Sequence, residues 1–273
     1  MKIGIDLGGT NVRMGVVNSG AIVRKIAEPC KSQASQDVVI EHLISMIHSI
    51  MDENIDGIGI GVPSVVDTEE GIVYDVANIP SWKEVPLKEI LEEEFGIPVM
   101  INNDCNCFAY GEYLFGEGAG YKDIVGVTLG TGVGMGLIID GNLYNGHNTG
   151  AGEIGCIAYL DHDYEYYCGS RFFQLHNATG EELYQKAMLG DGAALDLWSE
   201  MGKHIGNLIN TTLFAYDPEA IILGGSISSA FEFFSKAMYL QLENFPYSNT
   251  VKRIKIDVSS KSDIGILGAA MLK

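Results

Sequence analysis

Short apolar runs and small polar turns alternate at the start of the chain. Residues 1–7, 12–17 and 21–26 are rich in Ile and Val, and Gly, Asn or Ser lies between them. This arrangement is typical of neighbouring strands joined by tight turns, so we predict three strands here. From residue 36 to 51 the apolar positions recur at helical spacing instead, which predicts an amphipathic helix.

The same two patterns alternate through the rest of the chain. Thr179 and Glu182 have the spacing of a capping box at the start of one helix. Strands that alternate with helices indicate an α/β architecture. The further predicted strands are 55–62, 98–102, 220–223 and 254–258, and the further predicted helices are 86–95, 193–214 and 230–244, with others beginning at residues 104, 181 and 263.

One pattern occurs twice. Residues 2–17 read KIGIDLGGTNVRMGVV and residues 123–138 read DIVGVTLGTGVGMGLI, each a strand, a Gly/Thr turn and a second strand. An internal repeat of this kind suggests two similar lobes. Ligands favour the interface between domains and the carboxyl ends of strands, so we expect a site in a cleft between the lobes.

The net charge of the chain argues against two kinds of binding partner. The 273 residues include 17 Lys and Arg and 36 Asp and Glu, a formal net charge of −19. Such acidity argues against duplex nucleic acid and against an anionic membrane surface. The five cysteines are an odd number, the chain opens on a strand, and no apolar run reaches ~18 residues. We therefore expect a cytoplasmic protein without a nucleic-acid or membrane partner.

Three small-residue turns follow predicted strands. The first contains Gly8, Gly9, Thr10 and Asn11, and its backbone N–H groups can form a nest for an anion. Asp6 just before it is able to hold Mg²⁺, directly or through water. A plain hairpin turn explains one such motif equally well. Similar turns at 130–132 and 224–225 favour a cradle for the phosphates of a nucleotide.

Asp104 and Glu153 are the two acids whose positions suit a catalytic or substrate-binding role. Asp104 follows a predicted strand and opens a helix. The local sequence favours an N-cap role for it, and the functional interpretation is a general base that takes a proton from a hydroxyl. Glu153 lies among the small residues of the segment 150–156. It is either a solvated loop acid or a carboxylate that accepts hydrogen bonds from two sugar hydroxyls.

Other catalytic motifs are absent. The chain contains no Walker A sequence, no G-x-G-x-x-G after a strand and no G-x-S-x-G. The acidic, aromatic tract 161–167 is expected to be an exposed loop whose rings could cover a dimer contact. A zinc site is disfavoured because the paired C-x₂-C spacing is missing among the residues that could form one, which are His147, Cys156, His162, Cys168 and His176.

Seven motifs in order resemble the ROK family of bacterial sugar kinases, which belongs to the actin/Hsp70/hexokinase-like superfamily. Each motif alone is weak, but the series spans nearly the whole chain and is highly specific. The matching segments are Ile5–Asn11, Gly61-Val62-Pro63, Ala77–Trp82, Asn103-Asp104, Leu129–Gly134, Gly150–Gly155, and Asp217-Pro218 together with Gly224-Gly225-Ser226.

The resemblance implies two actin-like (ribonuclease H-like) lobes, each a mixed sheet flanked by helices, with a cleft between them. On this basis we expect an N-terminal lobe at 1–114 and a C-terminal lobe at 115–261, with a last helix at 262–273 that packs back on the first lobe. The implied activity is transfer of the γ-phosphoryl group of ATP, with Mg²⁺, to a hexose hydroxyl. The 6-hydroxyl of glucose or a related hexose is the usual target, and a homodimer is the usual assembly.

The resemblance also implies roles for residues of this chain. Asp104 would be the general base. Asn78, Asn103, Asp104 and Glu153 would contact the sugar, with Cys156 at the position of a further sugar contact. The residues on the nucleotide side, where Asp6 would also face Mg²⁺, would be Asp6, Gly8, Gly9, Thr10, Asn11, Thr131, Gly132, Gly224 and Gly225.

The chain departs from the family at two places. Cys156 stands where the family usually has a His that binds the sugar and, in many members, zinc. The cysteine-rich tract of the family keeps only Cys168, so we expect no structural zinc. We expect packing of Phe172 and Phe173 to hold this segment instead. Either Gln174 or Glu181 could replace the acid that ends the family tract.

These departures leave alternatives open. One is a kinase of N-acetylmannosamine, N-acetylglucosamine, fructose, mannose or allose. Another is a sugar-binding ROK protein without catalysis. A repressor of the same family is disfavoured, because such proteins carry an N-terminal helix-turn-helix and because the charge of −19 opposes DNA binding.

Overall fold

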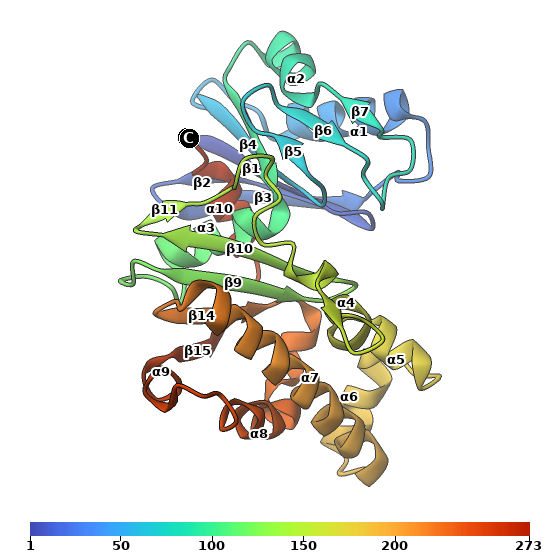
Figure 1. Ribbon diagram of the computed structural model, residues 1–273. Coiled ribbons are helices and arrows are strands. Elements are labelled where there is room, and N and C mark those ends of the chain that lie inside the picture. The colour runs from blue at the N-terminus through green and yellow to red at the C-terminus, as the bar shows by residue number, and fades with distance from the viewer. The chain divides into compact units, whose positions relative to one another are not determined.

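A computed structural model describes all residues, 1–273, and two compact units make up the chain (Figure 1). Unit 1 consists of Met1–Gly120, Gly136–Ala151 and Ser260–Lys273, and unit 2 of Tyr121–Met135 and Gly152–Ser259. Helices flank the sheets, and parallel and antiparallel pairs occur within one sheet. The α/β class with mixed sheets is therefore confirmed.

The main sheet of unit 1 has the strand order β3-β2-β1-β4-β8. The first three strands pair antiparallel, as the tight turns between them predict, and β1, β4 and β8 pair parallel. Helix α1 (Gln36–Ile50) contributes its apolar face to the core of this unit. The five strands are β1 (Lys2–Leu7), β2 (Asn11–Asn18), β3 (Ala21–Pro29), β4 (Gly57–Val62) and β8 (Val99–Asn103).

The last helix, α10 (Ile264–Ala270), packs directly against the backbone of this sheet. A Cβ atom at Gly4 would lie 2.0 Å from the carbonyl oxygen of Ile266, and one at Gly59 would lie 1.8 Å from that of Ala269. Only glycine permits such an approach. The same helix packs against α3 (Asp104–Phe115), so residues far apart in sequence complete one unit.

The sequence patterns do not predict the second, three-stranded sheet of unit 1. It pairs β5 (Val66–Asp67), β6 (Ile72–Tyr74) and β7 (Glu84–Val85), which are too short to show a period. The predicted helix that follows is α2 (Leu87–Phe95), and it ends at Gly96 in the left-handed conformation.

The other five-stranded sheet has the order β11-β10-β9-β14-β15, with β9, β14 and β15 parallel. In unit 2 the long helix α7 packs along α8, and the capping box of Thr179 and Glu182 is present at the start of α6. The elements are β9 (Ile124–Leu129), β10 (Val133–Ile139), β11 (Asn142–Leu143), β14 (Ala220–Gly224), β15 (Lys255–Val258), α6 (Gly180–Met188), α7 (Gly192–Tyr216), α8 (Phe231–Leu242) and α9 (Ser248–Arg253).

The prediction of an exposed loop at 161–167 is wrong. The segment forms β13 (His162–Asp163), which pairs with β12 (Ala158–Tyr159), and most of α4 (Tyr164–Cys168). Asp163 caps α4 by accepting a hydrogen bond from the backbone N–H of Tyr166, and Tyr164 is buried. A second short helix, α5 (Arg171–Leu175), follows. None of the helices combines the length and apolar character that a membrane span requires.

The close contact of α10 with β4 gives a test of the fold. Gly59→Ala should lower the free energy of unfolding by about 1–3 kcal/mol, because the added methyl group meets backbone atoms that cannot move away. Gly57→Ala on the same strand is the matched control, since its Cβ would have no neighbour nearer than 3.6 Å. Urea unfolding of both variants measures the difference, and equal stabilities would contradict this packing.

Candidate functional site

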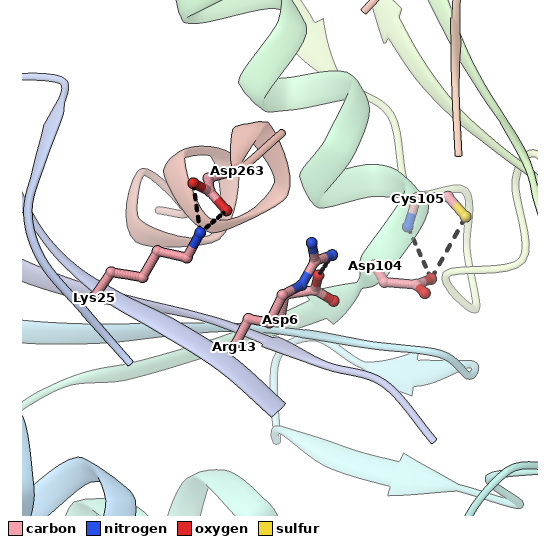
Figure 2. Close-up of polar contacts among 6 residues, drawn as sticks. All are labelled: Asp6, Arg13, Lys25, Asp104, Cys105 and Asp263. Atoms are coloured by element: carbon pink, nitrogen blue, oxygen red, sulfur yellow. Dashed lines mark hydrogen bonds and ion pairs between the residues drawn. The ribbon is translucent and has the colours of Figure 1, made fainter. Parts of the chain in front are cut away.

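The first Gly turn joins β1 to β2 in unit 1. The N–H of Gly8 donates to the carbonyl of Asn11 at 2.9 Å, which closes the turn, and the side chains of Thr10 and Asn11 are exposed. Asp6 lies opposite Arg13 in the strand register, and the two form an ion pair (Figure 2). The sequence motifs do not single out Arg13, although a tight turn between the two strands places it beside Asp6.

The turn also contacts a residue from the predicted sugar side. A Cβ atom at Gly9 would lie 2.4 Å from the Cβ of Asn78, so these two predicted site residues are neighbours. Asn78 itself is exposed. Gly9 is needed here because any larger residue would displace Asn78 or the turn.

Asp104, the predicted general base, lies at the start of α3. Asn103, not Asp104, is the N-cap: its side-chain oxygen accepts hydrogen bonds from the N–H groups of Cys105 and Asn106. The local prediction that Asp104 caps the helix is therefore wrong, because the preceding amide takes that position. Asn103 also donates to the carbonyl of Ser64 at 3.3 Å, so one amide hydrogen remains for another partner.

Asp104 is the first residue of α3, and its carboxylate accepts a hydrogen bond from the N–H of Cys105 at 2.9 Å (Figure 2). Burial, and to a smaller extent the negative charge of Asp6, raise the pKa of Asp104 from its ordinary value of 3.8 to about 6. Because Arg13 pairs with Asp6, its positive charge offsets part of this repulsion. The result is a carboxylate that is ionised at neutral pH and more basic than an exposed Asp.

An amide network behind Asp104 was not foreseen from the sequence. Asn106, fully buried on α3, donates to the side-chain oxygens of Asn102 and Asn145 at 2.9 and 3.3 Å. Asn102 in turn donates to Asn145 at 3.1 Å and accepts from the N–H of Asn103 at 2.8 Å. The network fixes the end of β8 where α3 begins. Asn102 stands in the Asn102-Asn103-Asp104 run, but its long-range partner Asn145 has no sequence signal.

The second Gly turn lies in unit 2, between β9 and β10. The N–H of Gly130 donates to the carbonyl of Gly132 at 3.0 Å, and the Thr131 side chain is exposed. The carbonyl of Gly130 accepts from the N–H of Ser170 at 2.8 Å. Exposed side chains and a tightly closed backbone leave this turn able to present its donors to a ligand.

The third turn, Gly224-Gly225, ends β14 beside the end of β9. Gly225 has φ of 83°, and a Cβ there would lie 2.2 Å from the carbonyl oxygen of Leu129. Because β9 and β14 are parallel, the second and third turns meet at one edge of the sheet. The structure thus brings Thr131, Gly132, Gly224 and Gly225 to the same edge.

Glu153 directly precedes the short 3-10 helix η1 (Ile154–Cys156) of unit 2, and Cys156 is the last residue of that helix. Burial and the charge of Glu165 raise the pKa of Glu153 above its ordinary value. Burial, and then the charges of Glu153, Glu165 and Asp163, raise the pKa of the Cys156 thiol. Cys156 is therefore a neutral thiol at physiological pH, a weak donor where a histidine would present a ring nitrogen.

The tract that corresponds to the cysteine-rich segment of the ROK family is packed with aromatic rings. Phe172 and Phe173 are buried, and the Phe173 ring lies 5.1 Å from that of Trp198. Burial raises the pKa of the Cys168 thiol. The protein has no group of three or more His, Cys, Asp or Glu side chains arranged to hold a metal ion. Gln174 on α5 and Glu181 on α6 are both exposed.

Comparison with known proteins identifies relatives over the full chain. A family model described as the ROK family matches residues 2–172 and 171–273. A glucokinase of Thermotoga maritima is 30% identical, with 99% of this chain and 96% of the relative covered. A protein of Cytophaga hutchinsonii has a structure with TM-score 0.88 and 28% identity, covering 99% and 98% of the two chains.

A structure of a ROK family glucokinase from Streptomyces griseus, in complex with glucose and AMPPNP, is also similar. Its TM-score is 0.85 at 26% identity, with 98% of this chain and 97% of that chain covered. The sheets and helices of the present chain therefore have the actin-like arrangement of ROK sugar kinases.

The raised pKa of Asp104 predicts how stability depends on pH. The pKa of Asp104 is about 6 in the folded protein and ordinarily 3.8. Ionisation of Asp104 therefore lowers the free energy of unfolding as the pH rises from 3.8 to about 6. Asp104→Asn removes that cost while Asn103 still caps the helix. We expect the stability of the variant relative to wild type to grow by roughly 1 kcal/mol between pH 5 and pH 8. Urea unfolding at both pH values measures this, and a difference that is independent of pH would contradict it.

Proposed function

The chain belongs to the ROK family, and on that premise we propose that it is an ATP-dependent sugar kinase that transfers the γ-phosphoryl group to the 6-hydroxyl of glucose or a related hexose. The observation that carries the proposal is Asp104 at the start of α3, next to Asp6, with a pKa raised to about 6. A carboxylate with this pKa is ionised at neutral pH and is still able to take a proton.

Asp104 would act as the general base. It removes the proton of the sugar hydroxyl as that oxygen attacks the phosphorus, and a base whose pKa lies near the working pH does this best. The Asn106 network and the Asn103 cap hold the helix start, so the carboxylate is positioned before the substrate arrives. Phosphoryl transfer depends mainly on such positioning and on stabilisation of charge.

The sugar would be oriented by polar groups at fixed backbone positions. Asn78 and the free amide hydrogen of Asn103 supply donors, and Glu153 supplies a carboxylate that accepts bonds from hydroxyl groups. Cys156 supplies only a weak donor, so one sugar hydroxyl is held less firmly than a histidine would hold it. A lost or weakened bond to a hydroxyl typically costs ~1–3 kcal/mol, which favours sugars that do not depend on this contact.

The phosphates of ATP would lie against the N–H groups of the first two Gly turns. The side chains of Thr10, Asn11 and Thr131 would add hydrogen-bond donors. Gly224-Gly225 would contact the adenosine. The residues present fit Mg²⁺, because this ion is commonly held by one or two carboxylates together with substrate phosphates, and Asp6 has an accessible carboxylate at the turn. Asp6 would hold the ion through water, and the ion would supply positive charge to the phosphates.

We further propose that the protein acts in the cytoplasm as a homodimer and holds no structural zinc. The buried pair Phe172 and Phe173, with Trp198, provides apolar packing where zinc would otherwise join chain segments. Metal analysis of the purified protein should therefore find far less than one zinc per chain. One zinc per chain that survives dialysis against a chelator would contradict the proposal.

The base is tested by Asp104→Asn. Turnover of the best sugar should fall by about 10²–10⁴-fold or more, because the hydroxyl loses its proton acceptor, while the sugar dissociation constant stays within about tenfold. A coupled ADP-release assay measures turnover with ATP, Mg²⁺ and a panel of glucose, mannose, allose, fructose, N-acetylglucosamine and N-acetylmannosamine.

Asp196→Asn, an exposed acid on α7, is the matched control and should keep wild-type activity. Wild-type turnover should also decline below about pH 6, where Asp104 takes up a proton. Near-normal turnover of Asp104→Asn would refute the general-base role, whereas an inactive wild type that still binds a sugar would favour a non-catalytic sugar-binding protein.

A further inference from the structure

Residues 145–151 of unit 1 form a closed loop that follows β11 and ends just before Gly152 and Glu153. The N–H of Ala151 donates to the carbonyl of Asn145 at 3.2 Å, which joins the two ends of the loop. Gly146 has φ of 73°, and a Cβ there would lie 3.0 Å from the Cβ of Ala151. The loop is therefore narrow at its base, and its two ends are held together.

Asn145 anchors the start of the loop. Its side-chain oxygen accepts hydrogen bonds from the side-chain amides of Asn102 and Asn106 at 3.1 and 3.3 Å. Both of these amides are buried, so the hydrogen bonds are shielded from water. Removal of the Asn145 oxygen would leave an N–H of each buried amide without this acceptor, an arrangement that folded proteins avoid.

Thr149 anchors the far side of the loop. It is buried, and its hydroxyl donates to the carbonyl of Val66, the first residue of β5. The backbone of Thr149 has φ of 56°, in the left-handed region that β-branched residues rarely adopt. Such a conformation persists only where the surrounding structure holds it, and the hydrogen bond to Val66 is the contact that does so here.

Both anchors lie next to groups that hold the proposed base. Asn102 accepts from the N–H of Asn103, which is the N-cap of the helix that Asp104 begins. Val66 follows Ser64 by two positions, and the carbonyl of Ser64 accepts from the side chain of Asn103. The loop is thus tied at two places to the backbone that surrounds Asn103 and Asp104.

The loop also fixes the start of the segment that contains Glu153. Ala151, whose N–H closes the loop, is followed by Gly152 with φ of 98°. A Cβ at Gly152 would lie 2.3 Å from the carbonyl oxygen of Met135 on β10. Backbone contacts therefore hold both residues that precede Glu153. Because the Glu153 side chain itself is exposed, its placement depends on this backbone.

We propose that Asn145 and Thr149 are positioning residues for the sugar: by anchoring the loop 145–151 next to Asn103 and Asp104, they fix the backbone that leads to Glu153. They act through the backbone, and the sugar contacts remain those of the proposed site. This inference rests on the proposed sugar kinase function. It extends the sugar site to two residues that lie outside the motifs matched in the sequence.

Two substitutions at Thr149 isolate its hydroxyl group. Thr149→Ser keeps the donor to Val66, whereas Thr149→Val keeps the branched shape and removes the donor. We expect Thr149→Val to raise the dissociation constant of the sugar about tenfold, and Thr149→Ser to stay within about twofold of wild type. Calorimetric titration measures each constant, with the sugar of the kinase panel that wild type binds most tightly.

At Asn145 the expected effect includes turnover. Asn145→Ala should raise the sugar dissociation constant about tenfold and lower kcat about fivefold, because Asn102 and Asn106 lose an acceptor near the base. Asn145→Asp keeps an oxygen acceptor for both amides and should hold kcat within about twofold of wild type. The dissociation constant of AMPPNP should stay within about twofold of wild type in all these variants, whereas a general loss of folding would raise it.

The control is Asn142→Ala on β11, which removes an exposed amide that donates to the carbonyl of Asp140 in its own turn, and it should match wild type in every measurement. The inference is overturned if Thr149→Val and Asn145→Ala bind the sugar as tightly as this control does. It is overturned equally if they lose affinity for AMPPNP and for the sugar in the same proportion. A wild type that neither binds nor phosphorylates any sugar of the panel would instead refute the proposed function, and the inference with it.

Discussion

The backbone contact between α10 and the first sheet determines where the two carboxylates of the candidate site in unit 1, Asp6 and Asp104, lie. The helix rests on Gly4 of β1 and Gly59 of β4, and it meets α3 at Gly111, where a Cβ would lie 2.2 Å from the carbonyl oxygen of Ile264. Asp6 is two residues beyond Gly4, and Asp104 begins the helix that contains Gly111. One short helix therefore fixes both acids, and close packing with no side chain between the backbones leaves them little freedom to shift.

The charges around Asp6 and Asp104 then determine how readily each carboxylate can take up a proton. The chain as a whole is strongly acidic, yet the two carboxylates that matter are placed next to each other, with Arg13 on only one of them. Asp6 is paired with Arg13, whereas no cation pairs with Asp104, and burial together with the charge of Asp6 raises the pKa of Asp104 to about 6. In unit 2 the pair Glu153 and Glu165 repeats this arrangement, since one acid makes a backbone hydrogen bond and the pKa of the other rises.

The features that the sequence predicted well are local. The hairpin, the helix predicted at 36–51 and the capping box at Thr179 depend on residues a few positions apart, and all are present. The division into lobes and the roles of the site residues remain expectations from the family pattern.

The predictions that failed have physical causes. Asn103 and Asp104 are both good N-caps, and only tertiary context decides between them. The tract 161–167 looks exposed by its charges, but stacking of Tyr164 on Tyr159 buries one side of it. The pairing of Asn106 with Asn145 spans 39 positions, and no local pattern encodes it.

The placement of α10 also bears on how the chain is made. Unit 1 begins with Met1–Gly120 but includes Ser260–Lys273, and all of unit 2 lies between these two segments in sequence. At a synthesis rate of ~5–20 residues per second, the first sheet waits on the order of ten seconds for the helix that covers it. During that interval the apolar faces of β1 and β4 have no partner on the side that α10 later covers. Completion of unit 1 is thus a late event rather than an early one, because α10 is made only after all of unit 2.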